Sequence, residues 1–171
     1  EMGATTKFTA TESAEAFNYM AMAGWKPQQM IDGISGIMSL AAASGEDLGT
    51  TSDIVTDAIT AFGLTAGDAG HFADVLAQAS ANANTDVSML GESFKYVAPV
   101  AGAMKYSIED TSLALGLMAS ANVKGSMSGT ALKTSIANMV KPTNDMAEAM
   151  DKYGISITDG EGNLKSLKGV I

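Results

Sequence analysis

The chain has 171 residues and a net charge of −9, with 10 basic and 19 acidic side chains, and it contains neither arginine nor cysteine. The absence of cysteine excludes disulfides, thiol catalysis and zinc–thiolate sites. The absence of arginine and the acidic balance disfavour nucleic-acid binding, because phosphates are neutralised by clustered basic side chains. Hydrophobic residues make up 46% of the chain. Many of them are alanine and methionine, so we expect a core of small and flexible side chains.

Most of the chain is predicted to form helices whose ends are marked by capping residues and glycines. Thr9 and Glu12 form a capping-box pattern that predicts the start of the first helix, and Gly24 predicts its end. Pro27 suits the first turn of the second helix, which Gly45 ends. Apolar residues at helical spacing continue this pattern. The expected helices cover roughly residues 9–23, 27–44, 51–62, 65–82, 86–104, 107–122, 126–140 and 143–153.

Two features interrupt this pattern. Pro99 lies inside the helix expected over 86–104 and should break or kink it. After the last helix, apolar and polar residues alternate at 155–157, and turn-forming residues fill 159–163. The tail is therefore predicted to make a small β-hairpin-like excursion near residues 155–165, followed by the start of another helix.

An internal repeat emerges when the chain is compared with itself at a shift of 80 residues. Gly49 then meets Gly129, and the similarity extends over residues 11–62 and 91–142. We interpret the repeat as a duplicated three-helix unit, with the helix at 66–82 as a connector. The alternative is chance similarity among helices rich in alanine and glycine.

These patterns predict an all-α protein, a compact multi-helix domain of about eight helices built on the duplicated unit. We expect residues 1–171 to form a single helical domain, a fragment of a longer chain, with residues 143–171 starting the next segment. The longest uncharged runs, 33–45 and 111–123, are shorter than the roughly 20 residues of a membrane-spanning helix.

Glycines inside long helices predict close packing. An interior glycine costs about 1 kcal/mol relative to alanine, which is tolerable where another backbone approaches closely. Gly36 and Gly116 are such residues, so we expect the helices at 27–44 and 108–122 to be central and packed against each other or against a partner. Gly45 and Gly125 are expected to be helix C-caps. The full set of expected helix stops and close-packing positions is Gly24, Pro27, Gly36, Gly45, Gly49, Pro99, Gly116, Gly125 and Gly129.

No catalytic, cofactor or metal site is predicted. His71 is expected to be a partly exposed helix residue, because no neighbouring motif supplies an acid or nucleophile. The segment 125–134 differs from a phosphate loop, since its lysine lies four residues after the second glycine. Asp159, Glu161 and Asn163 lack the rest of a calcium loop and predict a tight turn. Two carboxylate pairs are expected on solvated helix faces, Asp53 with Asp57 and Asp145 with Glu148.

Trp25 is a candidate interface or corner anchor, and the alternative is a plug in the core. The methionines leave the same choice open, because methionine fills cores and also lines adaptable binding surfaces. Partner binding or self-association therefore stays a hypothesis. The methionines at issue are Met20, Met22, Met30, Met38, Met89, Met104, Met118, Met127, Met139, Met146 and Met150.

Several segments are together similar to one protein family. They are Gly24-Trp25-Lys26, residues 36–48, 50–63, 92–102, 115–125 and 129–134, Lys141-Pro142 and residues 154–160. In this order and spacing they resemble the core region of bacteriophage tail tape measure proteins, also called phage minor tail proteins. The resemblance covers about residues 8–171.

The resemblance implies a structural, non-enzymatic role without a cofactor. Such proteins occupy the tail tube until the DNA leaves, and their total length sets the tail length. The implied partners are tail-tip and tail-tube proteins, tail assembly chaperones and further copies of the same protein, with no specific nucleic-acid binding. Membrane contact is expected only through the full-length protein. The implied locations are the phage tail of the virion and, during assembly, the bacterial cytoplasm.

Two alternatives stay open, a phage-associated cell-wall hydrolase domain and a membrane-active helical module. A hydrolase would need a cleft that holds a carboxylate with a raised pKa. Even a fully helical chain of this length would reach only about 260 Å at about 1.5 Å per residue. We therefore expect this fragment to be a compact head from which a longer helical ruler continues.

Overall fold

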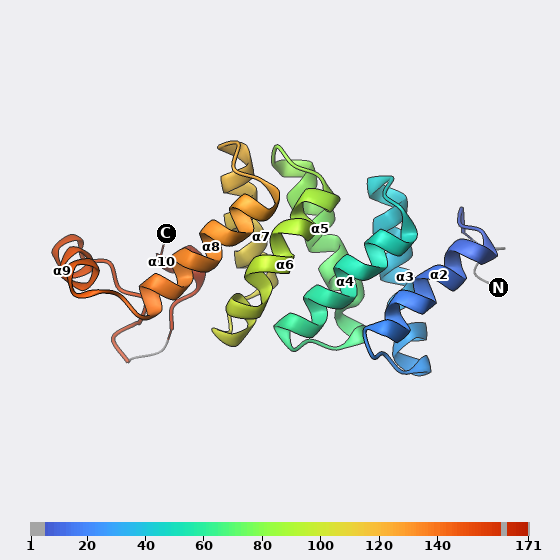
Figure 1. Ribbon diagram of the computed structural model, residues 1–171, viewed down its shortest axis with the longest axis horizontal. Coiled ribbons are helices and arrows are strands. Elements are labelled where there is room, and N and C mark those ends of the chain that lie inside the picture. The colour runs from blue at the N-terminus through green and yellow to red at the C-terminus, as the bar shows by residue number, and fades with distance from the viewer. Residues whose placement is uncertain (1–5, 162–163, 171) are drawn as a thin grey trace.

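The computed structural model describes residues 6–161 and 164–170, and within them the chain is mainly α-helical, without a strand (Figure 1). The all-α prediction is confirmed for these residues. The elements are α2 (Ala10–Met22), α3 (Pro27–Ser44), α4 (Leu48–Phe62), the 3-10 helix η1 (Ala66–Asp68), α5 (Ala69–Asn82), α6 (Val87–Ala103), α7 (Ile108–Ser120), α8 (Gly125–Val140), α9 (Asn144–Tyr153) and α10 (Leu167–Val170).

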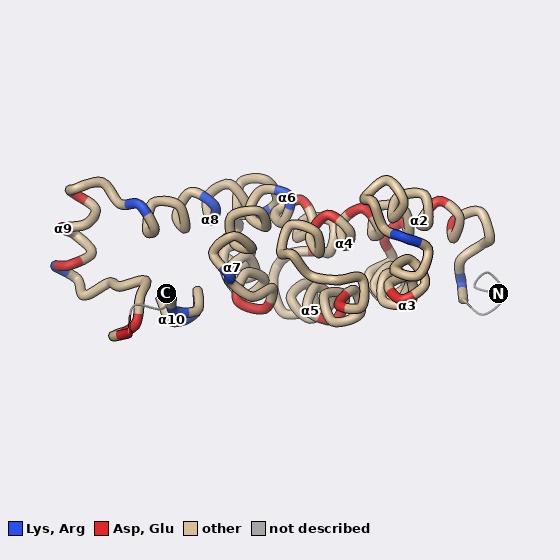
Figure 2. Tube along the Cα trace, turned by 90° about the horizontal axis from the view of Figure 1, so that it is seen from below, with Lys and Arg blue, Asp and Glu red and all other residues tan. Residues whose placement is uncertain are grey.

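The helices form two layers in which each helix packs against the second-next helix along the chain. One layer contains α2, α4, α6 and α8, and the other contains α3, α5 and α7, with α10 against α7. Figure 2 shows the two layers one above the other. Consecutive helices alternate between layers, so the assembly of α2 to α8, called here the two-layer row, grows along the longest axis of the molecule (Figure 1).

The core lies between the layers and contains a cluster of three phenylalanines. Phe72 of α5 and Phe94 of α6 are among the largest fully buried side chains, and their ring centroids lie 5.4 Å apart in an edge-on arrangement. Phe62 of α4 meets Phe94 in the same way at 5.9 Å. Such pairs contribute about 0.5–1.5 kcal/mol beyond burial. The cluster therefore joins both layers in the middle of the row.

Capping residues explain where the first helices begin and end. The Thr9 hydroxyl accepts a hydrogen bond from the Glu12 amide, and the Glu12 carboxylate accepts one from the Thr9 amide, which is the expected capping box. Gly24 and Gly45 follow α2 and α3 with φ angles of 84° and 77°. Glycine adopts this left-handed region without a steric penalty. Pro27 is the first residue of α3.

The sequence predicts that Pro99 breaks or kinks the helix; it does not break it, because α6 continues from Val87 to Ala103. The proline ring deprives the Lys95 carbonyl of its intrahelical donor. Pro99 and Lys95 are both exposed, so water can bond this carbonyl. Val97 and Ala101 are fully buried on either side of Pro99 and hold both parts of α6 in the core.

Gly125 begins α8, so the prediction that it is the C-cap of the preceding helix is wrong. Helix α7 ends at Ser120, and the left-handed residue that follows is Asn122, with a φ of 66°. Asparagine is one of the few residues other than glycine that visits this region routinely. Gly125 also has a positive φ of 57°, at the entry to α8.

The duplicated three-helix unit is not confirmed. Contacts between second-next helices run without interruption from α2 to α8, so no group of three helices is set apart. The expected connector, 66–82, forms η1 and α5 and lies between α3 and α7. The sequence predicts that the helices at 27–44 and 108–122 pack against each other or against a partner; both pack against α5, so the first alternative is wrong. Helices related by the 80-residue shift do share a layer: α2 with α6, α3 with α7, and α4 with α8.

The C-terminal part differs from the row. Helix α9 has no buried residue and lies beyond α8 at one end of the molecule (Figure 1). A single antiparallel bridge joins Thr158 and Leu164, so the β-hairpin excursion is not confirmed; Gly162 and Asn163 of the predicted turn lie outside the described residues. Over 6–161 and 164–170, no helix combines the length and hydropathy that crossing a membrane requires.

Candidate assembly surfaces

Glycines lie where helices of the second layer approach most closely. Gly36 of α3 faces Gly70 of α5, and a Cβ at Gly36 would lie 2.6 Å from the Cα of Gly70. Real Cβ atoms essentially never come so close to backbone, so the crossing of α3 and α5 requires a glycine here. Gly33 serves the neighbouring corner, where a Cβ would meet the ring of Trp25 at 2.5 Å.

The first layer uses glycine in the same way. A Cβ on Gly102 of α6 would collide with the carbonyl oxygen of Ala61 in α4, and one on Gly129 of α8 would collide with the carbonyl oxygen of Ser93 in α6. A Cβ on Gly91 would lie 2.5 Å from the side chain of Ile54. The sequence-based set contains Gly129 but misses Gly91 and Gly102. The interior-glycine argument applied to Gly36 also applies to both, and it would have identified them.

Two serines reinforce the contact between α6 and α8. Ser93 and Ser128 are 2% and 1% exposed, and their hydroxyl oxygens lie 2.8 Å apart. The Ser93 hydroxyl also reaches the carbonyl oxygens of Met89 and Gly125. Buried hydroxyls are costly without partners, so this satisfied pair sets the relative position of the two helices.

At two other glycines predicted to allow close packing, an added Cβ would meet a side chain rather than the backbone of another helix. Gly49 is buried in α4, where a Cβ would lie 2.8 Å from the ring of Tyr19. Gly116 is buried in α7, and its nearest neighbour would be the Cβ of Ala83 at an ordinary 3.4 Å. Trp25 is 8% exposed and belongs to the hydrophobic core, which places it inside the corner between α2 and α3.

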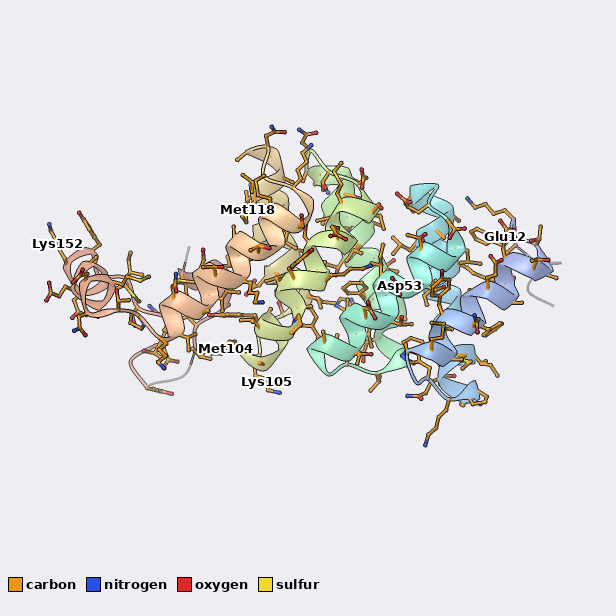
Figure 3. The ribbon with its side chains drawn as sticks, in the orientation of Figure 1. Glu12, Asp53, Met104, Lys105, Met118 and Lys152 are labelled. Carbon is orange, nitrogen blue, oxygen red and sulfur yellow. The ribbon has the colours of Figure 1, made fainter. Side chains whose placement is uncertain are left out.

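The methionines divide between core and surface. Met20 and Met38 are buried, while Met22, Met89 and Met127 are exposed at 76%, 42% and 65%. The others among the expected set are partly buried, among them Met104 after α6 and Met118 in α7 (Figure 3). Among the described residues, the exposed methionines therefore do not form one continuous surface for a partner.

His71 has a partner that sequence reasoning missed. Its Nε2 atom lies 2.5 Å from Oε1 of Glu109, which follows it by 38 residues. Partial burial opposes ionisation of Glu109, but hydrogen bonds from its own backbone, from His71 and from Ser107 outweigh this and lower its pKa. Both side chains are at least half exposed. The arrangement of His71 and Glu109 thus resembles a surface ion pair. No nucleophile and no metal ligand among the described residues is recognised beside it.

A hollow of about 280 Å³ lies between α4 and α6 and contains Asp57. Burial raises the pKa of Asp57, and the neighbouring charge of Asp53 raises it further, while Lys95 acts in the opposite direction. The Lys95 ammonium lies 3.2 Å from Oδ2 of Asp53. The other side chains that line the hollow are apolar. The hollow therefore holds one carboxylate with a raised pKa, that of Asp57, near the ion pair of Lys95 and Asp53.

The ends of the row differ in charge. The charged side chains of α2 are Glu12 and Glu15, flanked by Lys7 and Lys26, whereas the charged side chain of α8 is Lys133, flanked by Lys124 and Lys141. Figure 2 shows the lysines along α8 and the acidic residues over α2 to α4. In Figure 3, Glu12 on α2 and Lys152 on α9 lie toward opposite ends of the molecule.

The structure gives no ligand-binding role to the other candidate motifs. Residues 125–134 lie within α8, so their backbone amides are in a helix. In the described ranges 6–161 and 164–170, no group of three or more histidine or acidic side chains is arranged to hold a metal ion.

Comparison with known proteins gives the chain a set of relatives. Residues 1–171 match the model of the family described as phage-related minor tail protein. The chain is 40% identical over 168 residues to the tape measure protein of Pneumococcus phage Dp-1 and 25% identical over 167 residues to the probable tape measure protein of Escherichia phage P2. Both alignments cover 98% of this chain but only 15% and 20% of those proteins. No solved structure matches.

Proposed function

Because this chain belongs to the family of phage-related minor tail proteins, we propose that it is a non-catalytic assembly module of a tape measure protein. The observation that carries the proposal is the 40% identity to the tape measure protein of phage Dp-1 over 98% of the chain. In this role the full-length protein occupies the tail tube until DNA ejection, and its total length sets the length of the tail.

The module is proposed to dock or self-associate rather than to measure. A ruler gains length in proportion to residue number, about 1.5 Å per residue in a continuous helix. Here the helices fold back on one another in two layers, so added residues do not extend the chain in this way. The crossings at Gly36, Gly102 and Gly129 favour a rigid body that presents fixed surfaces.

The proposed partners are tail-tip and tail-tube proteins, tail assembly chaperones and other copies of the chain. The proposed locations are the tail of the virion and the bacterial cytoplasm during assembly. We do not expect specific nucleic-acid binding, since Lys133 and its neighbours are few and the net charge is −9. Membrane contact is proposed only for the full-length protein.

One observation supports the alternative that the chain is a cell-wall hydrolase domain: Asp57 lines a hollow and its pKa is raised. Glycoside hydrolysis normally uses two carboxyl groups on either side of the scissile bond. Asp53, the nearest second carboxyl group in sequence, lies on the same helix and is ion-paired with Lys95. This arrangement favours the assembly role over hydrolysis.

Two deletions of equal length in the phage that encodes this chain test the proposal. One removes residues 87–124, which contain α6 and α7, and the other removes the same number of residues from another, continuously helical part of the tape measure protein. We expect the first deletion to abolish tails and the second to shorten them by about 1.5 Å per residue, as measured by electron microscopy. Normal tails, or tails shortened in proportion by the first deletion, would contradict the assembly role.

A further inference from the structure

The two-layer row ends in two helix faces that no other helix covers. The outer face of α2 and the outer face of α8 consist of residues that are all exposed. Because each inner helix of this layer packs on both sides, these two faces are where the packing pattern stops. Among the exposed residues of the two helices, Thr11, Ala14, Glu15, Asn18 and Met22 are taken as the outer α2 face, and Lys133, Thr134, Ala137, Asn138 and the following Lys141 as the outer α8 face.

The contact between α4 and α6 shows how two helices of this layer fit together. Ile54 of α4 lies against Gly91 of α6, and the Ala61 carbonyl lies against Gly102. The edge of this contact carries the ion pair between Asp53 and Lys95. Ten of its residues are Asp53, Ile54, Asp57, Ala58 and Ala61 on α4, and Gly91, Phe94, Lys95, Ala98 and Gly102 on α6; Phe62 and Pro99 also belong to it.

The 80-residue shift relates this internal contact to the two free faces. Adding 80 to each α4 position gives the five positions of the outer α8 face, and subtracting 80 from each α6 position gives the five positions of the outer α2 face. A second copy placed with its α2 on α8 would thus continue the first layer with the helix spacing that α4 and α6 already have.

The charges at the related positions are complementary. Asp53 corresponds to Lys133, and Lys95 corresponds to Glu15, so the internal ion pair reappears with its signs exchanged. The outer α2 face carries Glu15 and no lysine, and the outer α8 face carries Lys133 and Lys141 and no acidic residue, so the two faces have opposite charge.

From this correspondence we propose that copies of the chain associate head to tail, with the outer α8 face of one copy against the outer α2 face of the next. The inference rests on the proposed assembly function and names the surface that serves it. A contact between two different faces does not close into a symmetric dimer, and it generates open filaments or rings.

The composition of the faces sets the strength of the contact. Phe94 and Ile54 of the internal contact correspond to Ala14 and Thr134, so the association buries less apolar surface than the packing of α4 on α6. It therefore depends on charge and weakens as salt screens exposed ion pairs. Helix α9 lies beyond α8 (Figure 1) and has no buried residue, so the proposed contact requires α9 to be displaced from this end of the row.

Charge exchange tests the proposal on the 171-residue chain by sedimentation velocity over a range of concentrations and salt. We expect the wild type to associate at low salt, and Glu15→Lys or Lys133→Glu alone to weaken association roughly tenfold, because each places like charges opposite each other. The double variant, which keeps the wild-type net charge, should regain association. A mixture of the two single variants should also regain association, since both contacts between unlike chains are complementary: Lys133 with Glu15, and the two substituted positions with each other.

The matched control is Asp74→Lys, which changes the net charge as Glu15→Lys does at an exposed position of α5, away from both faces. A wild type that stays monomeric at all concentrations, or association that both single variants retain, would overturn the head-to-tail contact. Either result would leave the assembly role open to its own test by tail length. Loss of tails is thus distinguishable from loss of self-association.

Discussion

The two-layer row and helix α9 use the same local chemistry, yet they differ in burial. The first turn of α4 is capped by Asp47, and that of α9 by Thr143; each helix ends at a glycine with a φ near 66°. Helix α4 buries Leu48, Val55 and Ile59 among others, whereas α9 buries no residue. Caps therefore decide where a helix begins and ends, and neighbours on both sides decide whether it contributes to the core.

The largest difference is expected from truncating one aromatic side chain in each region. Phe94→Ala removes a fully buried ring that touches two others, and it should lower the free energy of unfolding by about 3–5 kcal/mol. Tyr153→Ala on α9 removes a side chain that is 71% exposed, and it should change stability by less than about 0.5 kcal/mol. Urea unfolding followed by circular dichroism measures both. Similar losses in the two variants would show that α9 packs as tightly as the row.

Glycine substitutions should give the next largest difference. Gly129→Ala places a Cβ against the backbone of Ser93, and we expect a net loss of about 1–3 kcal/mol despite the better helix propensity of alanine. The matched control is Gly70→Ala in α5, where a Cβ has open space and stability should stay equal or rise.

The corresponding change in α9 is Gly154→Ala at a φ of 66°. The strain of about 1 kcal/mol should fray the end of α9 without moving the unfolding midpoint of the row. Hydrogen exchange at individual amides distinguishes the two regions. A shift of the global midpoint by Gly154→Ala, or none by Gly129→Ala, would contradict the comparison.

The smallest effects concern two carboxylates of the row and have opposite signs. The pKa of Asp57 is raised in the folded state, so its ionisation destabilises the fold as the pH rises, and Asp57→Asn should gain stability over the wild type as the pH rises above 3.8, the ordinary pKa of aspartate. The pKa of Glu109 is lowered, so the wild type should lose stability as the pH falls below 4.5, the ordinary pKa of glutamate, and Glu109→Gln should lack this loss.

Both pH effects are expected to be small because these side chains are partly exposed. Asp151→Asn on α9 serves as the control outside the row, where the side chain is exposed. Thermal unfolding at several pH values gives the difference curves. Curves of the same sign for Asp57→Asn and Glu109→Gln would be inconsistent with the described surroundings.

Helix positions could be predicted from sequence because caps act over three or four residues. The capping box predicted at Thr9 is present in the structure, which contains a second one at Thr65. The start of α4 was placed three residues late, since Asp47 rather than Thr51 supplies the cap. Asn122 rather than Gly125 is the left-handed residue that follows the end of α7, because asparagine as well as glycine adopts that conformation.

The pairing of helices could not be predicted in the same way. Gly36 indicates that another helix backbone approaches α3 closely, but nothing near it in the sequence identifies Gly70 of α5 as the residue that it meets. His71 and Glu109 meet only because α5 and α7 are neighbours in the second layer. The charge contrast between α2 and α8 was readable in the sequence, and it acquired a meaning only when the fold placed these helices at opposite ends of one layer.

The serial packing of the row has a mechanical consequence. The helix–helix contacts lie in series along the long axis, so tension along this axis acts on all of them. The weakest contact therefore breaks first, and the stronger contacts break at higher force. Each rupture releases a short length of chain, and the fully drawn-out polypeptide would span about 560–620 Å at 3.3–3.6 Å per residue. Under tension such a row would unfold in steps, and the released chain could refold onto the helices that are still packed.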